Sequence, residues 1–143
     1  MKSEHLGMFD RPTVIVADED PAMVAFIVDA LRPDGYAVFP AYDAFSAVQL
    51  AGHIPHVALL ISNTRVQGIP GIDLMHVIRA RLTRLPIIYI ANIDRSTPEI
   101  ESRLPPDIPI MREPFSADEL RAVANRLVGR APEMPPTSIT ERA

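Results

Sequence analysis

The sequence contains no cysteine, no long apolar run and no cluster of basic residues, and each absence excludes a class of function. A chain without cysteine has no disulfide framework, thiol nucleophile or zinc–thiolate site. No stretch is long enough to span a bilayer, and the first residues lack the basic and apolar regions of a signal peptide. The net charge is −4 and the basic residues are scattered, which argues against nucleic-acid binding. We therefore expect a cytoplasmic protein with neither a membrane nor a nucleic acid as partner.

Patterns of nucleotide chemistry are also missing. There is no G-x-G-x-x-G or P-loop pattern, and no pairing of a nucleophile with a base is visible. The four histidines have no spacing that forms a metal site: His5, His53, His56 and His76. We do not expect an enzyme, although an unrelated doubly wound enzyme stays open as an alternative.

The 143 residues fit one globular domain, with 48% hydrophobic and 22% charged residues. Short β-branched runs at 13–17, 36–41, 57–62, 86–91 and 108–111 alternate with segments of helical period. This alternation predicts an α/β fold of three αβα layers, with five βα units around a parallel sheet. Pro40 places the second run at a sheet edge. We assign the domain to 12–130, with flexible tails at 1–11 and 131–143.

In such a sheet the functional site lies at the carboxyl ends of the strands. Two adjacent acids, Asp18 and Glu19, follow the first predicted strand, and they suggest a site for a magnesium-like cation. In the alternative interpretation Asp20 caps a helix that begins at Pro21, and the two acids are solvated. A second capping signal, Ser116 with Glu119, begins the last helix, and Gly129 ends it.

Four segments together resemble a bacterial response-regulator receiver domain of the CheY-like family. These are "VIVADEDP", "LLISNTRVQGIPGIDL", "PIIYIAN" and "REPFSADEL", spaced along the chain at the intervals of that family. The resemblance covers roughly residues 12 to 130. It implies a flavodoxin-like fold with a five-stranded parallel sheet in the order 2-1-3-4-5. It also implies a cis peptide bond before Pro114.

The resemblance fails at the positions that carry the chemistry of the family. The phosphoacceptor aspartate falls on Asn63, the Thr or Ser on Ala91, the lysine on Glu113 and the aromatic switch residue on Ile110. No shift of register recovers the lysine, because the only lysine in the chain is Lys2. An asparagine amide is neutral and its nitrogen lone pair is delocalised, so it cannot attack phosphorus as a carboxylate does. We expect a degenerate receiver, a pseudo-receiver without a phosphoacceptor.

The matching acids, Asp18 and Glu19, are then candidate ligands for a weakly bound magnesium ion, and we expect no other cofactor. Arg65 and Arg112 flank them and either pair with them or are solvated. Ser62 precedes the phosphoacceptor position on a strand, so its side chain should point to the opposite face.

The resemblance implies a role in two-component or phosphorelay signalling through protein–protein contact, independent of phosphorylation. The partner would be a histidine kinase, a phosphotransfer protein or an output protein. The family presents the face made by its fourth helix, fifth strand and fifth helix, which here corresponds to 96–127, and a homodimer through that face is a further arrangement it allows. The alternative is a receiver-fold protein controlled by a metal ion or small anion at the acidic pocket.

Overall fold

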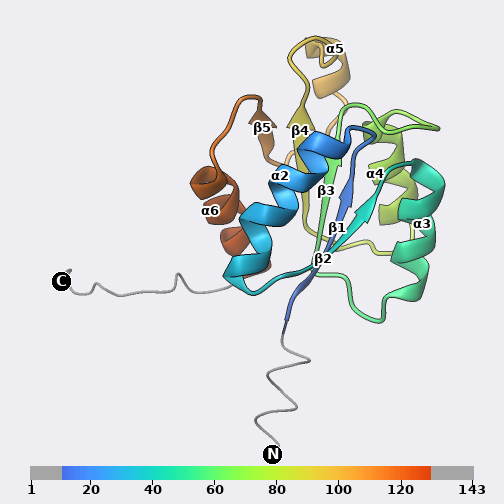
Figure 1. The fold of residues 1–143 in the computed structure, drawn as a ribbon. Coiled ribbons are helices and arrows are strands. Elements are labelled where there is room, and N and C mark those ends of the chain that lie inside the picture. Colours follow the sequence, from blue (N-terminus) through green and yellow to red (C-terminus); the bar gives the residue numbers. More distant parts are fainter. Residues whose placement is uncertain (1–10, 130–143) are drawn as a thin grey trace, which may run out of the picture.

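The computed structural model describes residues 11–129 (Figure 1). The tails expected at 1–11 and 131–143 lie outside the described residues, apart from Arg11. The elements follow one another along the chain as β1 (Thr13–Ala17), α2 (Pro21–Leu31), the 3-10 turn η1 (Arg32–Asp34), β2 (Ala37–Ala41), α3 (Ala44–His53), β3 (Leu59–Asn63), α4 (Gly71–Arg79), β4 (Ile87–Ala91), α5 (Pro98–Glu101), β5 (Ile110–Arg112) and α6 (Ala117–Val128).

The five strands form one parallel sheet in the order β2-β1-β3-β4-β5, which confirms the predicted fold class. Pro40 lies in the edge strand β2, where its missing N–H leaves no ladder bond unmade. Several predicted strand boundaries differ from the observed ones by one or two residues. β2 begins at Ala37 instead of Tyr36, and β4 begins at Ile87 instead of Pro86. β3 covers Leu59–Asn63 instead of 57–62, and β5 covers Ile110–Arg112 instead of 108–111. The fifth strand begins only after Pro109, because proline has no N–H for the pairing. The Pro109 carbonyl oxygen still accepts a hydrogen bond from Tyr89 N at 3.0 Å.

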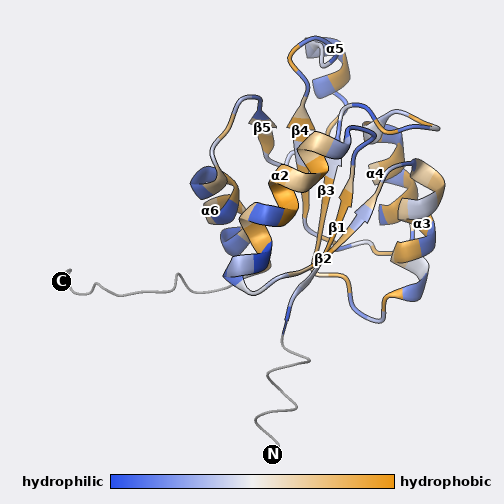
Figure 2. Cartoon of the chain, viewed as in Figure 1, coloured by the Kyte–Doolittle hydropathy of each residue, from blue (hydrophilic) through white to orange (hydrophobic). Residues whose placement is uncertain are grey.

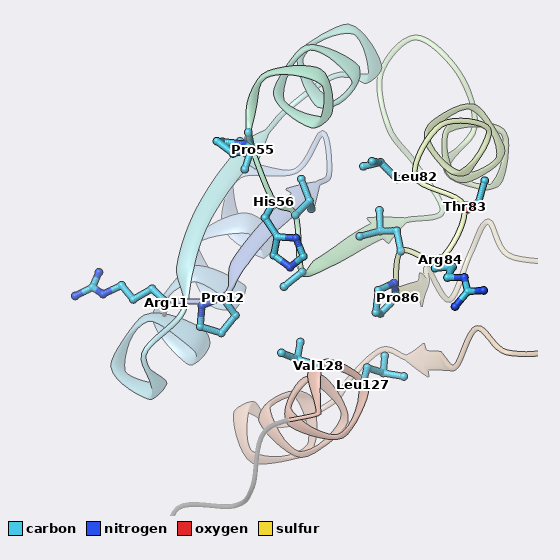
Figure 3. A pocket seen from close by; sticks show the side chains of 14 residues that line it. Arg11, Pro12, Pro55, His56, Leu82, Thr83, Arg84, Pro86, Leu127 and Val128 are labelled. Carbon is cyan, nitrogen blue, oxygen red and sulfur yellow. The ribbon is translucent and has the colours of Figure 1, made fainter. Parts of the chain in front are cut away.

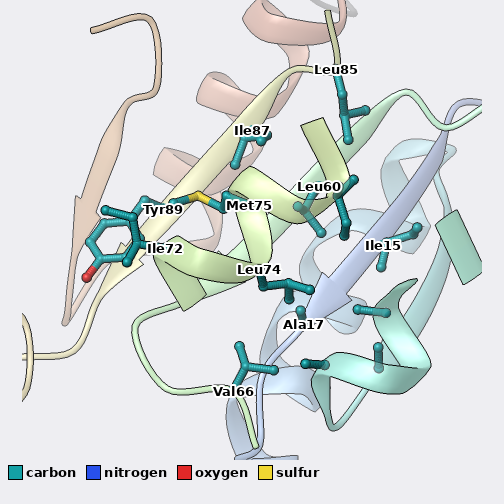
Figure 4. Packing of buried hydrophobic residues seen from close by; sticks show 14 of the residues in the cluster. Ile15, Ala17, Leu60, Val66, Ile72, Leu74, Met75, Leu85, Ile87 and Tyr89 are labelled. Atoms are coloured by element: carbon teal, nitrogen blue, oxygen red, sulfur yellow. The ribbon is translucent and has the colours of Figure 1, made fainter. Parts of the chain in front are cut away.

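Helices cover both faces of the sheet, with α2 and α6 on one side and α3 and α4 on the other (Figure 1). Because successive strand residues point to opposite faces, the strands supply two separate cores. The central strands β3 and β4 are buried along their whole length and are apolar throughout most of it (Figure 2). Figure 4 shows the core on the α4 side, where Leu60, Ile72, Leu74 and Met75 pack together.

The predicted helix ends are confirmed. The Asp20 side chain caps α2 by accepting a hydrogen bond from Ala22 N at 3.0 Å, and Pro21 occupies the first turn. Ser116 and Glu119 form a capping box at the start of α6, and Gly129 ends that helix in the left-handed conformation. Among residues 11–129, none of the helices is long and apolar enough to cross a membrane.

Candidate functional site

The carboxyl ends of β1, β3 and β5 bring Asp18, Asn63 and Glu113 together, although they are far apart in the sequence. Asp18 is only 2% exposed and Asn63 only 3%. The first residue of α4, Gly71, packs directly on the end of β3. A Cβ atom at that position would lie 1.8 Å from the Asn63 carbonyl oxygen, so only glycine fits there. Asp18, Asn63 and Glu113 therefore form one polar cluster, called the acidic pocket below, in which Glu113 is half-buried.

The side-chain amide of Asn63 donates to the two acids. Its Nδ2 lies 2.8 Å from Asp18 Oδ2 and 3.4 Å from Glu113 Oε2. On the other side, Asn63 Oδ1 accepts a hydrogen bond from the backbone N–H of Arg65 at 3.2 Å. A backbone N–H can only donate and a carboxylate can only accept, so these partners fix which way the amide points. Asn63, which the resemblance aligns with the phosphoacceptor, is thus a hydrogen-bond donor to carboxylates.

Asp18 carries the strongest electrostatic perturbation of this pocket. Burial raises its pKa to about 6, opposed by hydrogen bonds from Asp20 N and the Asn63 amide and assisted by the negative charges of Asp20 and Glu113. Burial is the main cause of the raised pKa. The negative charge of Glu113, at the position where the resemblance implies a lysine, adds a smaller contribution in the same direction, whereas a lysine there would lower the pKa.

The two arginines expected beside the acids have different partners. Arg65 Nη2 lies 2.9 Å from Glu19 Oε2, and its carbonyl oxygen accepts a hydrogen bond from Glu19 N at 3.4 Å. Arg65 therefore joins the β1–α2 loop to the β3–α4 loop at the rim of the site. Arg112 instead pairs with Glu101 on α5, because it ends β5 next to that helix. Of the two alternatives left open for Arg112, pairing with the acidic cluster was wrong, and its side chain is exposed.

The other positions singled out in the sequence lie beside the pocket. Ala91 ends β4 and is buried in the α4-side core. Ile110 is half-buried and pairs in register with Tyr89. The Ser62 side chain points away from the acids, as expected, and its hydroxyl lies 3.3 Å from the Gly71 carbonyl oxygen. The peptide bond between Glu113 and Pro114 is cis, as the resemblance implied.

Sequence reasoning missed a chain of hydrogen-bonded side chains behind the pocket. The Thr64 and Tyr89 hydroxyl oxygens lie 2.8 Å apart, and the Tyr89 hydroxyl lies 2.9 Å from Ser96 Oγ. Ser96 Oγ donates to Glu101 Oε2 at 2.7 Å, and Arg112 completes the chain. The one signal for it in the sequence is a tyrosine within an otherwise aliphatic central strand.

In this arrangement the acidic residues do not fit a magnesium ion. Magnesium binds oxygen ligands, yet Asn63 presents its amide nitrogen to Asp18, and the Asn63 oxygen is taken by a backbone N–H. The Glu19 carboxylate is paired with Arg65. Residues 11–129 contain no group of three or more His, Asp or Glu side chains placed to hold a metal ion. Weak magnesium binding therefore stays a prediction, and it requires the Asn63 side chain to turn.

A groove of about 720 Å³ lies at the opposite end of the sheet, away from the acidic pocket (Figure 3). It is lined by the start of β1, the loops before β3 and β4, and the end of α6, including Pro12, His56, Arg84 and Leu127. His56 and Arg84 are exposed, and none of the lining residues belongs to the acidic pocket. The groove has a size that suits a ligand, but it is separate from the site that the sequence motifs define.

The chain matches no family model. It is 29% identical over 121 residues to the sensor histidine kinase TmoS of Ectopseudomonas mendocina, covering 83% of this chain and 12% of that protein. It is 28% identical over 119 residues to the probable transcriptional regulatory protein TcrX of Mycobacterium tuberculosis, covering 80% of this chain and 50% of that protein. The chain thus spans half or less of the length of these two curated relatives.

Solved structures resemble the chain over most of its length. The receiver domain of the Francisella response regulator 1452 has a TM-score of 0.73 and 26% identity, with 83% of this chain and 98% of that chain covered. A response regulator receiver protein from Sinorhizobium medicae has a TM-score of 0.76 and 20% identity, covering 85% and 97%. The fold is therefore that of response-regulator receiver domains, a flavodoxin-like parallel sheet in the order 2-1-3-4-5.

Proposed function

We propose that this chain is a pseudo-receiver, which acts by protein–protein contact in two-component signalling and does not depend on phosphorylation. The single observation that carries this proposal is the orientation of Asn63. Its amide donates to Asp18 at 2.8 Å, at the position where a receiver would hold its phosphoacceptor. Formation of an acyl phosphate requires a carboxylate oxygen that attacks phosphorus in line, and an amide bound in this way offers none.

The residues around Asn63 support the same proposal. Glu113 adds a negative charge beside Asp18, so an incoming phosphoryl group would be repelled where a lysine would attract it. Ala91 has no hydroxyl group to bind a phosphoryl oxygen, and Ile110 has no aromatic ring to move in response. The nucleophile, the stabilising charge and the structural response are all absent from these positions, and a loss of all three favours a constant state over a switch.

Partner contact is proposed for the face made by α5, β5 and α6. It carries exposed charges, including Arg103, which pairs with Asp73 of α4 at 2.9 Å. The relatives named above are a sensor histidine kinase and a transcriptional regulatory protein, and by this likeness the partner would be a histidine kinase, phosphotransfer protein or output protein. The contact is proposed to take place in the cytoplasm. A homodimer through the same face is compatible with the proposal. No catalytic activity is proposed.

The alternative, control by a metal ion or a small anion at the acidic pocket, has less support. The pocket is negatively charged, which disfavours an anion. Asp18 already accepts a hydrogen bond from Asn63, and Glu19 is already ion-paired with Arg65. Neither ligand has a prepared set of partners.

The proposal is tested by capture of partners on immobilised protein, with acetyl phosphate and magnesium either present or absent. We expect the same partner under both conditions. Arg103→Glu, on the proposed face, should lose it, whereas the charge-matched control Arg84→Glu, at the opposite end of the sheet, should retain it. A partner captured only with the phosphodonor, or lost equally in both variants, would contradict the proposal.

A further inference from the structure

Tyr89 is a fully buried residue in the middle of β4, yet its hydroxyl group has two hydrogen-bond partners. Figure 4 shows the ring beside Ile72, at the edge of the α4-side core, with the hydroxyl pointing away from that core. The hydroxyl contacts Thr64 Oγ1 at 2.8 Å and Ser96 Oγ at 2.9 Å. One phenol therefore joins the residue directly after Asn63 to the loop between β4 and α5.

The direction of this chain follows from counting hydrogen atoms. Glu101 accepts from Arg112 at 2.6 Å and from Ser96 at 2.7 Å, and these hydrogen bonds, that of Arg112 foremost, lower its pKa, so it is a carboxylate that can only accept. The single hydroxyl hydrogen of Ser96 points to Glu101, which leaves the Tyr89 hydrogen for Ser96. The single hydroxyl hydrogen of Thr64 has two acceptors at 2.8 Å, the Tyr89 hydroxyl oxygen and the Ile90 carbonyl oxygen, and is shared between them. From Tyr89 onward the hydrogen bonds run one way toward an ionised end. Hydrogen bonds arranged in such series strengthen one another.

The series of hydrogen bonds that starts at Thr64 ends on α5, a helix that is too short to be stable alone. The helix α5 has four residues, Pro98–Glu101, and isolated helices of that length do not form in water. Apolar contacts with the core come from the half-buried Ile100 of α5 and from Leu104, three residues after its end. Asn92, at the start of the preceding loop, donates its backbone N–H to Thr64 Oγ1 at 3.0 Å. Both the loop and the helix are thus held through side-chain hydroxyl groups.

Tyr89 lies in the sheet next to the position where the family resemblance implies an aromatic residue that moves. That position is Ile110, which pairs in register with Tyr89. The neighbouring phenol here is enclosed, with the exposed fraction of Tyr89 at 0%, and it is bonded on two sides. An aromatic ring held in this way cannot follow the state of the pocket.

We propose that Thr64, Tyr89 and Ser96 form an internal tether that holds residues 92–104 in one position against β3, so that the face containing α5 is preformed. The step from a fixed segment to partner contact rests on the proposed function. The tether itself does not, because it is defined by contacts within the chain.

Hydrogen–deuterium exchange of the whole chain tests the tether without a partner. Tyr89→Phe keeps the ring and removes the hydroxyl, and Ser96→Ala cuts the same chain one step further along. We expect exchange within residues 92–104 to become about fivefold faster in each variant, as loss of one buried hydrogen bond implies. Tyr36→Phe is the matched control, because this buried tyrosine bonds Asn125 in the other layer and should leave residues 92–104 unchanged.

An unchanged exchange rate at 92–104 in either Tyr89→Phe or Ser96→Ala would overturn the tether. So would a rise spread equally over the whole chain, since it would mean general loss of stability. Because no partner enters the measurement, the outcome is independent of whether the proposed function holds. If the wild-type protein proves to be phosphorylated, the proposed function fails while the exchange result still decides the tether.

Discussion

Replacement of Asn63 by aspartate is expected to destabilise the protein at high pH. The new carboxylate would be about as buried as Asn63, which is 3% exposed, and would lie where the amide nitrogen now sits, 2.8 Å from Asp18 Oδ2. With an effective dielectric constant of about 20, two unit charges at this distance repel by about 6 kcal/mol. The pair avoids part of this cost by retaining a proton. We expect Asn63→Asp to lower the free energy of unfolding by about 4 kcal/mol at pH 8 and by under about 1 kcal/mol at pH 5.

The direction in which the free energy of unfolding of this variant changes with pH follows from proton linkage. The folded variant holds a proton between its two carboxyl groups, whereas the unfolded chain releases it above pH about 4, so stability falls as the pH rises. At pH 5 the protonated carboxyl group introduced at position 63 donates to Asp18 as the amide did, which explains the small effect there.

Urea denaturation at pH 5 and pH 8, followed by circular dichroism, measures the effect. The control is the exchanged pair, Asp18→Asn combined with Asn63→Asp, which keeps one amide and one carboxylate. The exchanged amide can accept from Asp20 N and donate to position 63, while the new carboxylate accepts from Arg65 N. Only the long contact with Glu113, at 3.4 Å, loses its donor. We expect the exchanged pair to recover most of the loss at pH 8. A single variant as stable as wild type at pH 8 would refute the close contact between positions 18 and 63.

The same pocket supports three further predictions. Burial raises the pKa of Asp18 from 3.8 to about 6, so ionisation of this group lowers the free energy of unfolding by about 3 kcal/mol. The free energy of unfolding should therefore fall between pH 4 and pH 6. Denaturation curves of Asp18→Asn should show a smaller decline over this range. Gly71→Ala places a methyl group 1.8 Å from the Asn63 carbonyl oxygen and should lower the free energy of unfolding by about 3 kcal/mol in urea denaturation. Gly52→Ala on α3, where the methyl group would meet only Arg81 Nη1 at 4.0 Å, should be neutral or stabilising in the same assay. Calorimetry should find no magnesium dissociation constant tighter than about 1 mM, because the Asn63 oxygen is engaged; a tighter value would favour the metal-controlled alternative.

Much of the fold could be predicted because local signals and the family resemblance agree. The apolar runs identify all five strands, the capping box identifies the start of α6, and Pro40 identifies the edge strand. Errors of boundary occurred where a proline carbonyl continues the pairing without an N–H, as at Pro109, and where a polar residue ends a buried strand, as at Asn63.

The site could be predicted as a set of positions but not as a set of contacts. Strand ends of a parallel sheet meet at one edge, so the sequence brings Asp18, Asn63 and Glu113 together. It does not reveal which atom of the Asn63 amide faces the acids, because that depends on a backbone N–H two residues later. The partner of Arg112 and the tether through Tyr89 depend on how β4, β5 and α5 are placed in space. Residue spacing in the sequence does not reveal that placement.

Intact mass spectrometry measures whether this protein accepts a phosphoryl group. The wild-type protein and Asn63→Asp are incubated with acetyl phosphate and magnesium, beside a receiver that is known to be phosphorylated and beside the combined variant Asn63→Asp, Ala91→Thr, Glu113→Lys. We expect the wild type to keep its unmodified mass, while the known receiver gains one phosphoryl group. Asn63→Asp alone should stay largely unmodified, because Glu113 remains beside the new carboxylate. Stoichiometric phosphorylation of the wild-type protein would show that it is not a pseudo-receiver.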